Sequence, residues 1–162
     1  MRRLEYLLMA LLLLSNPLAL ALSSDKDQPV ELAADSVDLD EAKQVSVYKG
    51  DVDLRQGSMR LRADQVTVQH QGRKPDRLIA VGRPVRFEQR TGKGKKVKAR
   101  ARRAEYEVNS EVLTLIGDAV LTQDGDTLKS DRIVYDRVRH KVKAGAAAKG
   151  KKRVRITIQP GK

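Results

Sequence analysis

Four aspartates recur in this chain at a common offset of 67 residues: Asp51 with Asp118, and Asp64 with Asp131. Paired carboxylates can act as general acid and base when the fold brings them to one site. Asp51 and Asp118, however, each directly follow a glycine, and all four lie near turn residues. An aspartate in that position commonly hydrogen-bonds the turn backbone, so we expect structural rather than catalytic carboxylates.

The two histidines, His70 and His140, are the other candidates for acid–base or metal chemistry. Each lies in a polar, turn-like context, and neither has a second histidine at metal-ligand spacing. The chain contains no cysteine, and it has no nucleophile elbow, phosphate-cradling glycine loop or nucleophile–base pair. We therefore expect two exposed surface histidines, and no metal, no cofactor and no enzymatic activity.

The recurring aspartates belong to a repeated segment. Residues 50–68, GDVDLRQGSMRLRADQVTV, correspond without a gap to residues 117–135, GDAVLTQDGDTLKSDRIVY, and the same offset pairs Ala34 with Ala101. This agreement indicates an internal duplication of a β unit. Each copy alternates apolar and polar residues around a glycine-containing turn, as two strands do when one face is buried and the other is solvated.

The same alternation runs through most of the chain. Val97, Ala99 and Ala101 alternate with basic residues, and turn residues recur every eight to twelve positions. Aromatic residues total 3% of the 162 residues and tryptophan is absent, so Leu, Val, Ile and Ala must form the core. These features predict one all-β domain, either a sandwich or a jelly roll. Within it we expect one strand ending at Gly82 and another starting after Pro84, a turn or bulge at Gly50, and a low-complexity linker at 145–150.

The N-terminus has the pattern of a signal peptide. A basic start at Met1–Arg3 precedes the apolar run 7–14, and Pro17 and the small-residue pattern at 19–21 follow. We expect cleavage after Ala21. The alternative is an uncleaved single-span anchor, although the run is shorter than the roughly 20 residues that a bilayer span needs. The predicted organisation is a signal peptide at 1–21, a flexible leader at 22–29, a β domain at 30–159 and a tail at 160–162.

Charge is unevenly distributed along the chain. Residues 22–75 hold ten acidic and eight basic residues, a net charge of −2, whereas residues 76–162 hold ten acidic and 23 basic residues, a net charge of +13. A basic half suggests an anionic partner, and the alternative is a solvated, solubilising face. We do not expect nucleic acid, because the basic clusters lack interleaved aromatic residues on which bases stack.

Several segments resemble the OstA-like family of periplasmic lipopolysaccharide bridge proteins. They are DKDQPV at Asp25–Val30, GRPVRF at Gly82–Phe87, AEYEV at Ala104–Val108, residues 113–135 and KGKKRV at Lys149–Val154. The resemblance covers residues 25–159. It implies an open, twisted β-jelly roll of two related halves that holds lipid A in an apolar groove. It also implies head-to-tail stacking between an inner-membrane-anchored homologue, which delivers the lipid, and the N-terminal domain of the outer-membrane translocon, which receives it.

An inner face built of small and medium aliphatic residues can leave a lane for acyl chains. We nominate as groove contacts Val30, Leu32, Phe87, Tyr106, Val108, Leu113 and Leu115. The resemblance matches four of these to lumen-facing positions of the family: Val30, Phe87, Tyr106 and Val108. The alternative is that all seven are ordinary core residues, because core and groove share the same inner face.

Two further surfaces follow from the expected bridge. Exposed strand edges can recruit further strands by β-augmentation, and we expect such edges at Val30–Ala34 and at Val154, Ile156 and Ile158. Lipopolysaccharide phosphates at the groove mouth are expected to contact Lys95, Lys96, Lys98, Arg100, Arg102 and Arg103, unless these form only a solvated face. Two other functions stay open: a membrane-anchored lipopolysaccharide-transfer protein, and a structural or carbohydrate-binding envelope module.

Overall fold

One antiparallel sheet accounts for almost all of the chain in the computed structural model, which describes residues 25–160. The predicted signal peptide and its cleavage at Ala21 lie outside this range. The elements are η1 (Asp25–Asp27), β1 (Val30–Ala33), β2 (Ser36–Asp40), β3 (Val45–Gln56), β4 (Met59–Gln71), β5 (Lys74–Arg90), β6 (Lys96–Glu107), β7 (Val112–Gln123), β8 (Asp126–Asp136), β9 (Lys141–Ala144), η2 (Gly145–Ala148) and β10 (Arg155–Thr157). Within residues 25–160, no helix is both long and apolar enough to cross a membrane.

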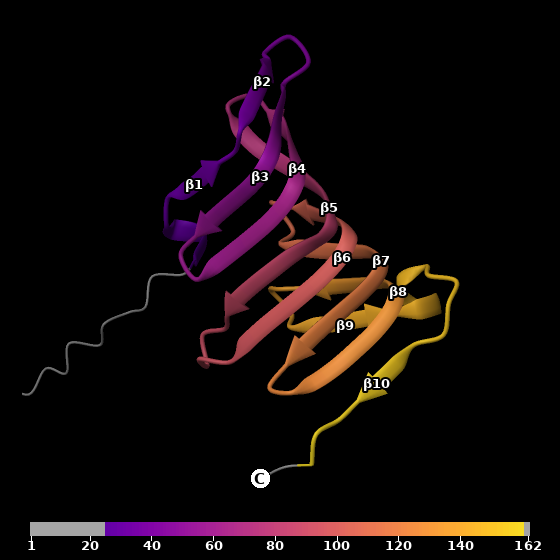
Figure 1. Cartoon of the computed structure of the whole chain (residues 1–162). Coiled ribbons are helices and arrows are strands. Elements are labelled where there is room, and N and C mark those ends of the chain that lie inside the picture. The colour runs from indigo at the N-terminus through magenta and orange to yellow at the C-terminus, as the bar shows by residue number, and fades with distance from the viewer. Residues whose placement is uncertain (1–24, 161–162) are drawn as a thin grey trace, which may run out of the picture.

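The long strands run side by side in chain order from β3 to β8, and the register shifts near the middle of each pair. These shifts lie between Lys49 and Val52, Arg62 and Gln65, Val81 and Val85, Arg100 and Arg103, and Ile116 and Ala119. A bulge bends a strand and increases its twist, so a row of bulges folds the sheet over on itself. Each long strand therefore passes from one layer into the other, and the two layers face each other (Figure 1).

The short strands extend both layers at both ends of the sheet. β1 pairs with the second half of β3 and β2 with its first half. In the same way, β10 pairs with the first half of β8 and β9 with its second half. Each end of the sheet thus presents one edge strand for each layer.

Glycine starts the bulge in two of the long strands. Gly50 and Gly117 both have φ = 80°, and the aspartates that follow them, Asp51 and Asp118, have φ values of 41° and 47°. L residues rarely adopt positive φ, and glycine does so without a steric cost. The sequence correspondence at an offset of 67 residues therefore extends to the backbone conformation of these two positions.

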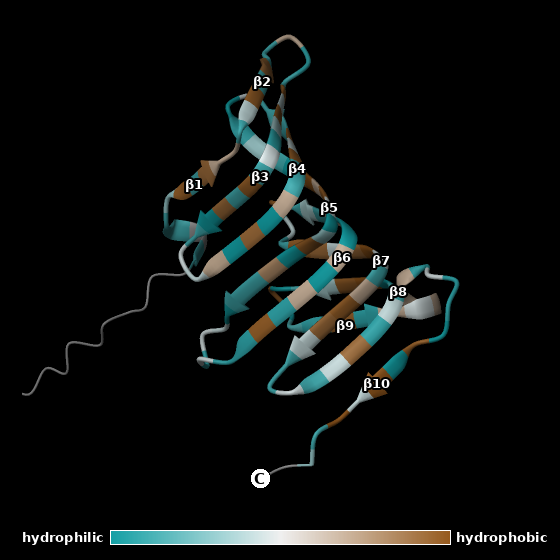
Figure 2. Ribbon diagram, viewed as in Figure 1, coloured by the Kyte–Doolittle hydropathy of each residue, from teal (hydrophilic) through white to brown (hydrophobic). Residues whose placement is uncertain are grey.

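The core lies between the two layers. Figure 2 shows hydrophobic and hydrophilic residues alternating along the long strands, as the sequence predicts. The buried set is rich in small residues, which include Ala63, Ala80, Ala99, Ala101, Ala104 and Ala119. The predicted fold class, an all-β protein with an open sheet of the jelly-roll kind, is confirmed.

Two local features differ from the sequence prediction. Two separate strands were expected around Gly82, whereas β5 runs through it as a single strand with a register shift. A linker was expected at 145–150, whereas Gly145–Ala148 form a 3-10 helix that buries Gly145 and Ala148. Within the expected flexible leader, Asp25 accepts hydrogen bonds from the Ser58 amide at 2.7 Å and from the Gln89 side chain at 2.8 Å.

Candidate functional site

A small apolar pocket of about 20 Å³ lies between the two layers of the sheet, whose side chains otherwise fill the space. Its walls are Leu54, Met59, Leu61, Val66, Leu78, Ala80, Phe87, Ala104, Tyr106 and Leu113. Both layers contribute, because the bulges separate Leu61 and Phe87 from Leu78 and Tyr106 along their strands. The structure thus brings together three of the seven nominated groove residues: Phe87, Tyr106 and Leu113.

The other four nominated residues lie outside this pocket. Leu115 is buried in the core two positions after Leu113. Leu32 packs against the core from β1, and Val30, on the same face, is 56% exposed. Val108 follows β6, is partly buried, and donates its amide to the Asp76 carbonyl at 2.9 Å.

A polar cluster lies at one side of the pocket. The Arg137 guanidinium donates a hydrogen bond to the Tyr106 hydroxyl at 2.6 Å, and its central carbon lies 5.5 Å from the centroid of the Tyr106 ring. This distance is within the range of a cation–π contact. Burial raises the pKa of Tyr106, and the nearby Arg137 charge opposes this effect. The Tyr106 phenol therefore stays protonated at neutral pH.

Sequence reasoning did not single out Arg137, because 31 positions separate it from Tyr106. The 67-residue offset could have drawn attention to Arg137, since it places Arg137 in correspondence with His70.

The prediction that His70 is an exposed surface residue was wrong. Its ring is half-buried and bonds the buried Ser46 hydroxyl at 2.9 Å. His140 is exposed, as predicted.

The nominated phosphate contacts lie away from the pocket. Lys98, Arg100 and Arg102 are exposed and alternate with the buried residues of β6, so they project from the outer face of the sheet. Most of the set is already paired with carboxylates: Lys95 with Asp124, Lys96 with Glu88, Arg102 with Asp118, and Arg103 with Glu105. Their outer-face position differs from the predicted groove mouth, because the strand period directs every second side chain away from the interior.

A basic cleft of about 650 Å³ lies on this outer face near the C-terminus. Six cationic residues line it: Arg100, Lys129, Lys151, Lys152, Arg153 and Arg155. The Asp131 carboxylate, also in the cleft, accepts the amides of Lys151 and Lys152 at 2.6 and 3.2 Å, and the first of these bonds contributes most to lowering its pKa. These bonds hold the start of the C-terminal segment against β8.

Apolar side chains remain exposed at both ends of the sheet. Val30 and Leu39 lie on the two edge strands at one end, and Ile156, flanked by Val154 and Ile158, lies on β10 at the other. Ile156 is opposite the partly buried Leu128, so its 63% exposed side chain continues the inner face. Among residues 25–160, β1 and β10 each pair on one side alone, which leaves backbone groups for a further strand.

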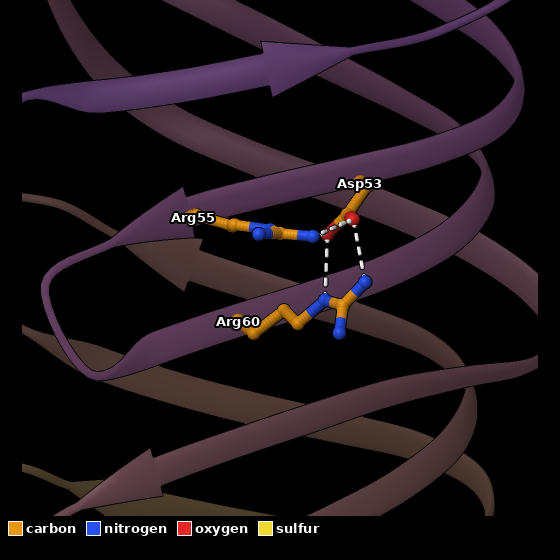
Figure 3. A network of polar contacts seen from close by, with 3 residues as sticks. All are labelled: Asp53, Arg55 and Arg60. Atoms are coloured by element: carbon orange, nitrogen blue, oxygen red, sulfur yellow. Dashed lines mark hydrogen bonds and ion pairs between the residues drawn. The ribbon is translucent and has the colours of Figure 1, made fainter.

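An ion-pair network stabilises the outer face next to β1. Asp53 accepts hydrogen bonds from Arg60 at 2.7 and 2.9 Å and from Arg55 at 2.9 Å (Figure 3). The hydrogen bonds from Arg60, followed by those from Arg55, hold the pKa of Asp53 well below its usual range. The carboxylate is therefore charged at neutral pH.

Replacing Asp53 with asparagine is expected to lower the free energy of unfolding by about 1 kcal/mol near neutral pH. Because the folded-state pKa is depressed, this stability is present above the unfolded-state pKa, about 4, and is lost as the pH falls toward the folded-state value. Urea unfolding of both proteins from neutral to acidic pH measures the difference. A difference that stays constant over this range would contradict the assignment to the Asp53 charge.

Comparisons with known proteins give a consistent result. Residues 31–141 match the family model described as LptA/(LptD N-terminal domain) LPS transport protein. The chain is 37% identical to lipopolysaccharide export system protein LptH of Pseudomonas aeruginosa over 156 residues, covering 92% of this chain and 89% of that protein. It is 31% identical to LptA of Haemophilus influenzae over 159 residues, covering 96% and 91%.

A solved structure shows the same fold. It is the crystal structure of LptH, described as the LptA-homologous periplasmic component of the conserved lipopolysaccharide transport device from Pseudomonas aeruginosa. The TM-score is 0.77 at 34% identity, and the match covers 85% of this chain and 99% of that one.

Proposed function

The chain belongs to the LptA/LptD N-terminal domain family of lipopolysaccharide transport proteins, and we propose that it carries lipopolysaccharide through the periplasm from the inner to the outer membrane. In this proposal the signal peptide at 1–21 is removed after Ala21. The mature chain is a binding protein and not an enzyme, and its cargo is held through the lipid A acyl chains.

The observation that carries this proposal is the apolar pocket between the two layers. Acyl chains require a water-free surface without polar groups that need hydrogen-bond partners, and the pocket walls are aliphatic and aromatic. The many buried alanines limit how far side chains project from the two inner faces. A modest separation of the layers would then extend the pocket into a lane, with Leu32, Val108 and Leu115 along its length.

The open ends of the sheet support the second part of the proposal, a head-to-tail bridge. β1 and β10 offer unpaired edges, and their exposed apolar side chains continue the inner face to both ends. β-Augmentation between copies would join these edges and cover those side chains. The partners would be further copies of this chain, the membrane-anchored homologue at one end and the N-terminal domain of the outer-membrane translocon at the other.

Photo-crosslinking in cells tests the cargo. A photoreactive residue in place of Tyr106 or of Phe87 is expected to form an adduct with lipopolysaccharide. Val81 offers a matched control, because it is apolar and on a neighbouring part of the sheet but 41% exposed on the outer face. Equal adducts from Val81 and Tyr106, or none from either pocket position, would contradict lipid carriage between the layers.

Exchanging Arg153 and Arg155 for glutamate tests the bridge. Both residues line the basic cleft beside β10, and charge reversal there should weaken the approach of the less basic N-terminal end of the next copy. We expect self-association in low salt to weaken about tenfold, with a smaller effect in high salt as screening increases. Sedimentation of the variant alongside an Arg73→Glu, Lys74→Glu control, which reverses one exposed charge in the β4–β5 turn and one at the start of β5, measures this. Unchanged association would argue against a charged contact at β10.

A further inference from the structure

Arg137 is a cation enclosed by the protein with little to neutralise it. Its side chain is 11% exposed, and the nearest carboxylate among residues 25–160, that of Glu111, lies 4.0 Å away. A guanidinium has five N–H donors, and the described residues accept a single hydrogen bond from it, at the Tyr106 hydroxyl. Arg139, two positions later, is 72% exposed and forms a 2.9 Å ion pair with Asp136.

Arg137 adjoins the pocket through Tyr106, which forms part of the pocket wall. It directly follows β8, at the end of one layer, and its amide is bonded to the Glu111 carbonyl at 3.1 Å. The end of the other layer carries Asp25, bonded to Ser58 and Gln89. Burial raises the pKa of Asp25, but hydrogen bonds from these two residues and the Arg137 charge together lower it. The Arg137 charge therefore acts, as the smallest of these influences, on a carboxylate of the other layer.

The chemistry of this position fits one class of anion. A planar guanidinium matches the geometry of phosphate oxygens and can donate two parallel hydrogen bonds to them. Its orientation is set by the Tyr106 hydroxyl and ring. The same tyrosine forms part of the apolar wall, so a ligand that reaches the guanidinium also reaches the pocket.

We infer that Arg137 binds a phosphate monoester of a lipid headgroup whose acyl chains enter the apolar pocket beside Tyr106. This inference rests on the proposed function and deepens it, because it assigns the phosphate contact to one residue beside the apolar pocket and not to the outer face of β6. A lipid is favoured over free phosphate because the cation adjoins an aliphatic pocket and not a polar one.

The test measures the affinity of the purified full chain for three probes: phosphorylated lipid A, enzymatically dephosphorylated lipid A, and inorganic phosphate alone. For the unaltered protein, loss of the lipid phosphates is expected to weaken binding about tenfold. Arg137→Gln should show the same loss toward phosphorylated lipid A and no change toward the dephosphorylated form. Arg137→Lys should retain part of the affinity, and Arg139→Gln, the matched control, should behave as the unaltered protein. Thermal unfolding checks that all variants fold.

The outcomes separate the two proposals. If phosphorylated and dephosphorylated lipid A bind equally well, or if Arg137→Gln weakens both to the same extent, Arg137 has a structural role and the inference is overturned. Binding of inorganic phosphate alone as tightly as phosphorylated lipid A would overturn the assignment to a lipid. If the unaltered protein binds no lipid A in any form, the proposed function fails and this inference fails with it.

Discussion

Replacing Phe87 with alanine is expected to lower the free energy of unfolding by about 3–5 kcal/mol, the usual cost of removing a buried phenylalanine. Phe87 is 3% exposed and lies between Leu61 of β4 and Ala99 of β6 in the sheet. Alanine would leave a cavity in the wall of the pocket, and neighbouring alanines are too short to fill it. Urea unfolding followed by circular dichroism measures the change.

The size of this loss of stability also shows whether the Phe87 ring is packed in a filled core or faces an open lane for acyl chains. Val81→Ala on the outer face is the control, and it should change stability by about 0.5 kcal/mol or less. If Phe87→Ala cost less than about 1 kcal/mol, the phenyl ring would not be packed on its inner side. That result would contradict the assignment of Phe87 to the core and leave a groove contact as its role.

Gly50→Ala is expected to destabilise the protein by about 2–4 kcal/mol. The backbone at Gly50 has φ = 80°, where an L residue costs about 1–2 kcal/mol. A Cβ there would also lie 2.1 Å from a carboxylate oxygen of Asp35 and 2.8 Å from its Cβ. Relieving this overlap displaces the segment between β1 and β2, whose amide at Asp35 is bonded to the Gly50 carbonyl.

Gly72→Ala separates the two contributions. Gly72 has φ = 64°, and a Cβ there would meet nothing within 4 Å. We therefore expect it to cost only the conformational part, about 1–2 kcal/mol. Thermal or chemical unfolding of both variants gives the difference. Equal losses in the two variants would show that Asp35 moves aside freely and that the bulge tolerates a side chain.

Much of the fold could be predicted from local pattern. Alternation identified the long strands, and Gly50 marked a turn or bulge, because period and glycine conformation are properties of short segments. The division of β5 into two strands failed because Gly82 and Pro84 resemble a strand end. The segment 145–150 was assigned to a linker because its composition does not reveal that Ala148 packs into the interior.

The candidate site was predictable only in its apolar part. Phe87, Tyr106 and Leu113 share the inner face that alternation predicts, and the structure brings them to one pocket. Its polar part depends on contacts between distant residues. Arg137 reaches Tyr106 because β8 and β6 are both neighbours of β7, and His70 reaches Ser46 across the β3–β4 pair. The uneven charge of the sequence instead led to the nomination of phosphate contacts on β6, whose cations face outward.

The row of bulges makes the width of the interior a collective property of the sheet. Adjacent strands share their hydrogen-bond ladders on both sides of the row, so one strand cannot change its bend without straining the next. A cargo that pushes the layers apart at one point would therefore widen the whole length of the molecule. If copies join at β1 and β10, that widening would pass to the neighbouring molecule, and loading at one end would prepare the next subunit to receive the cargo.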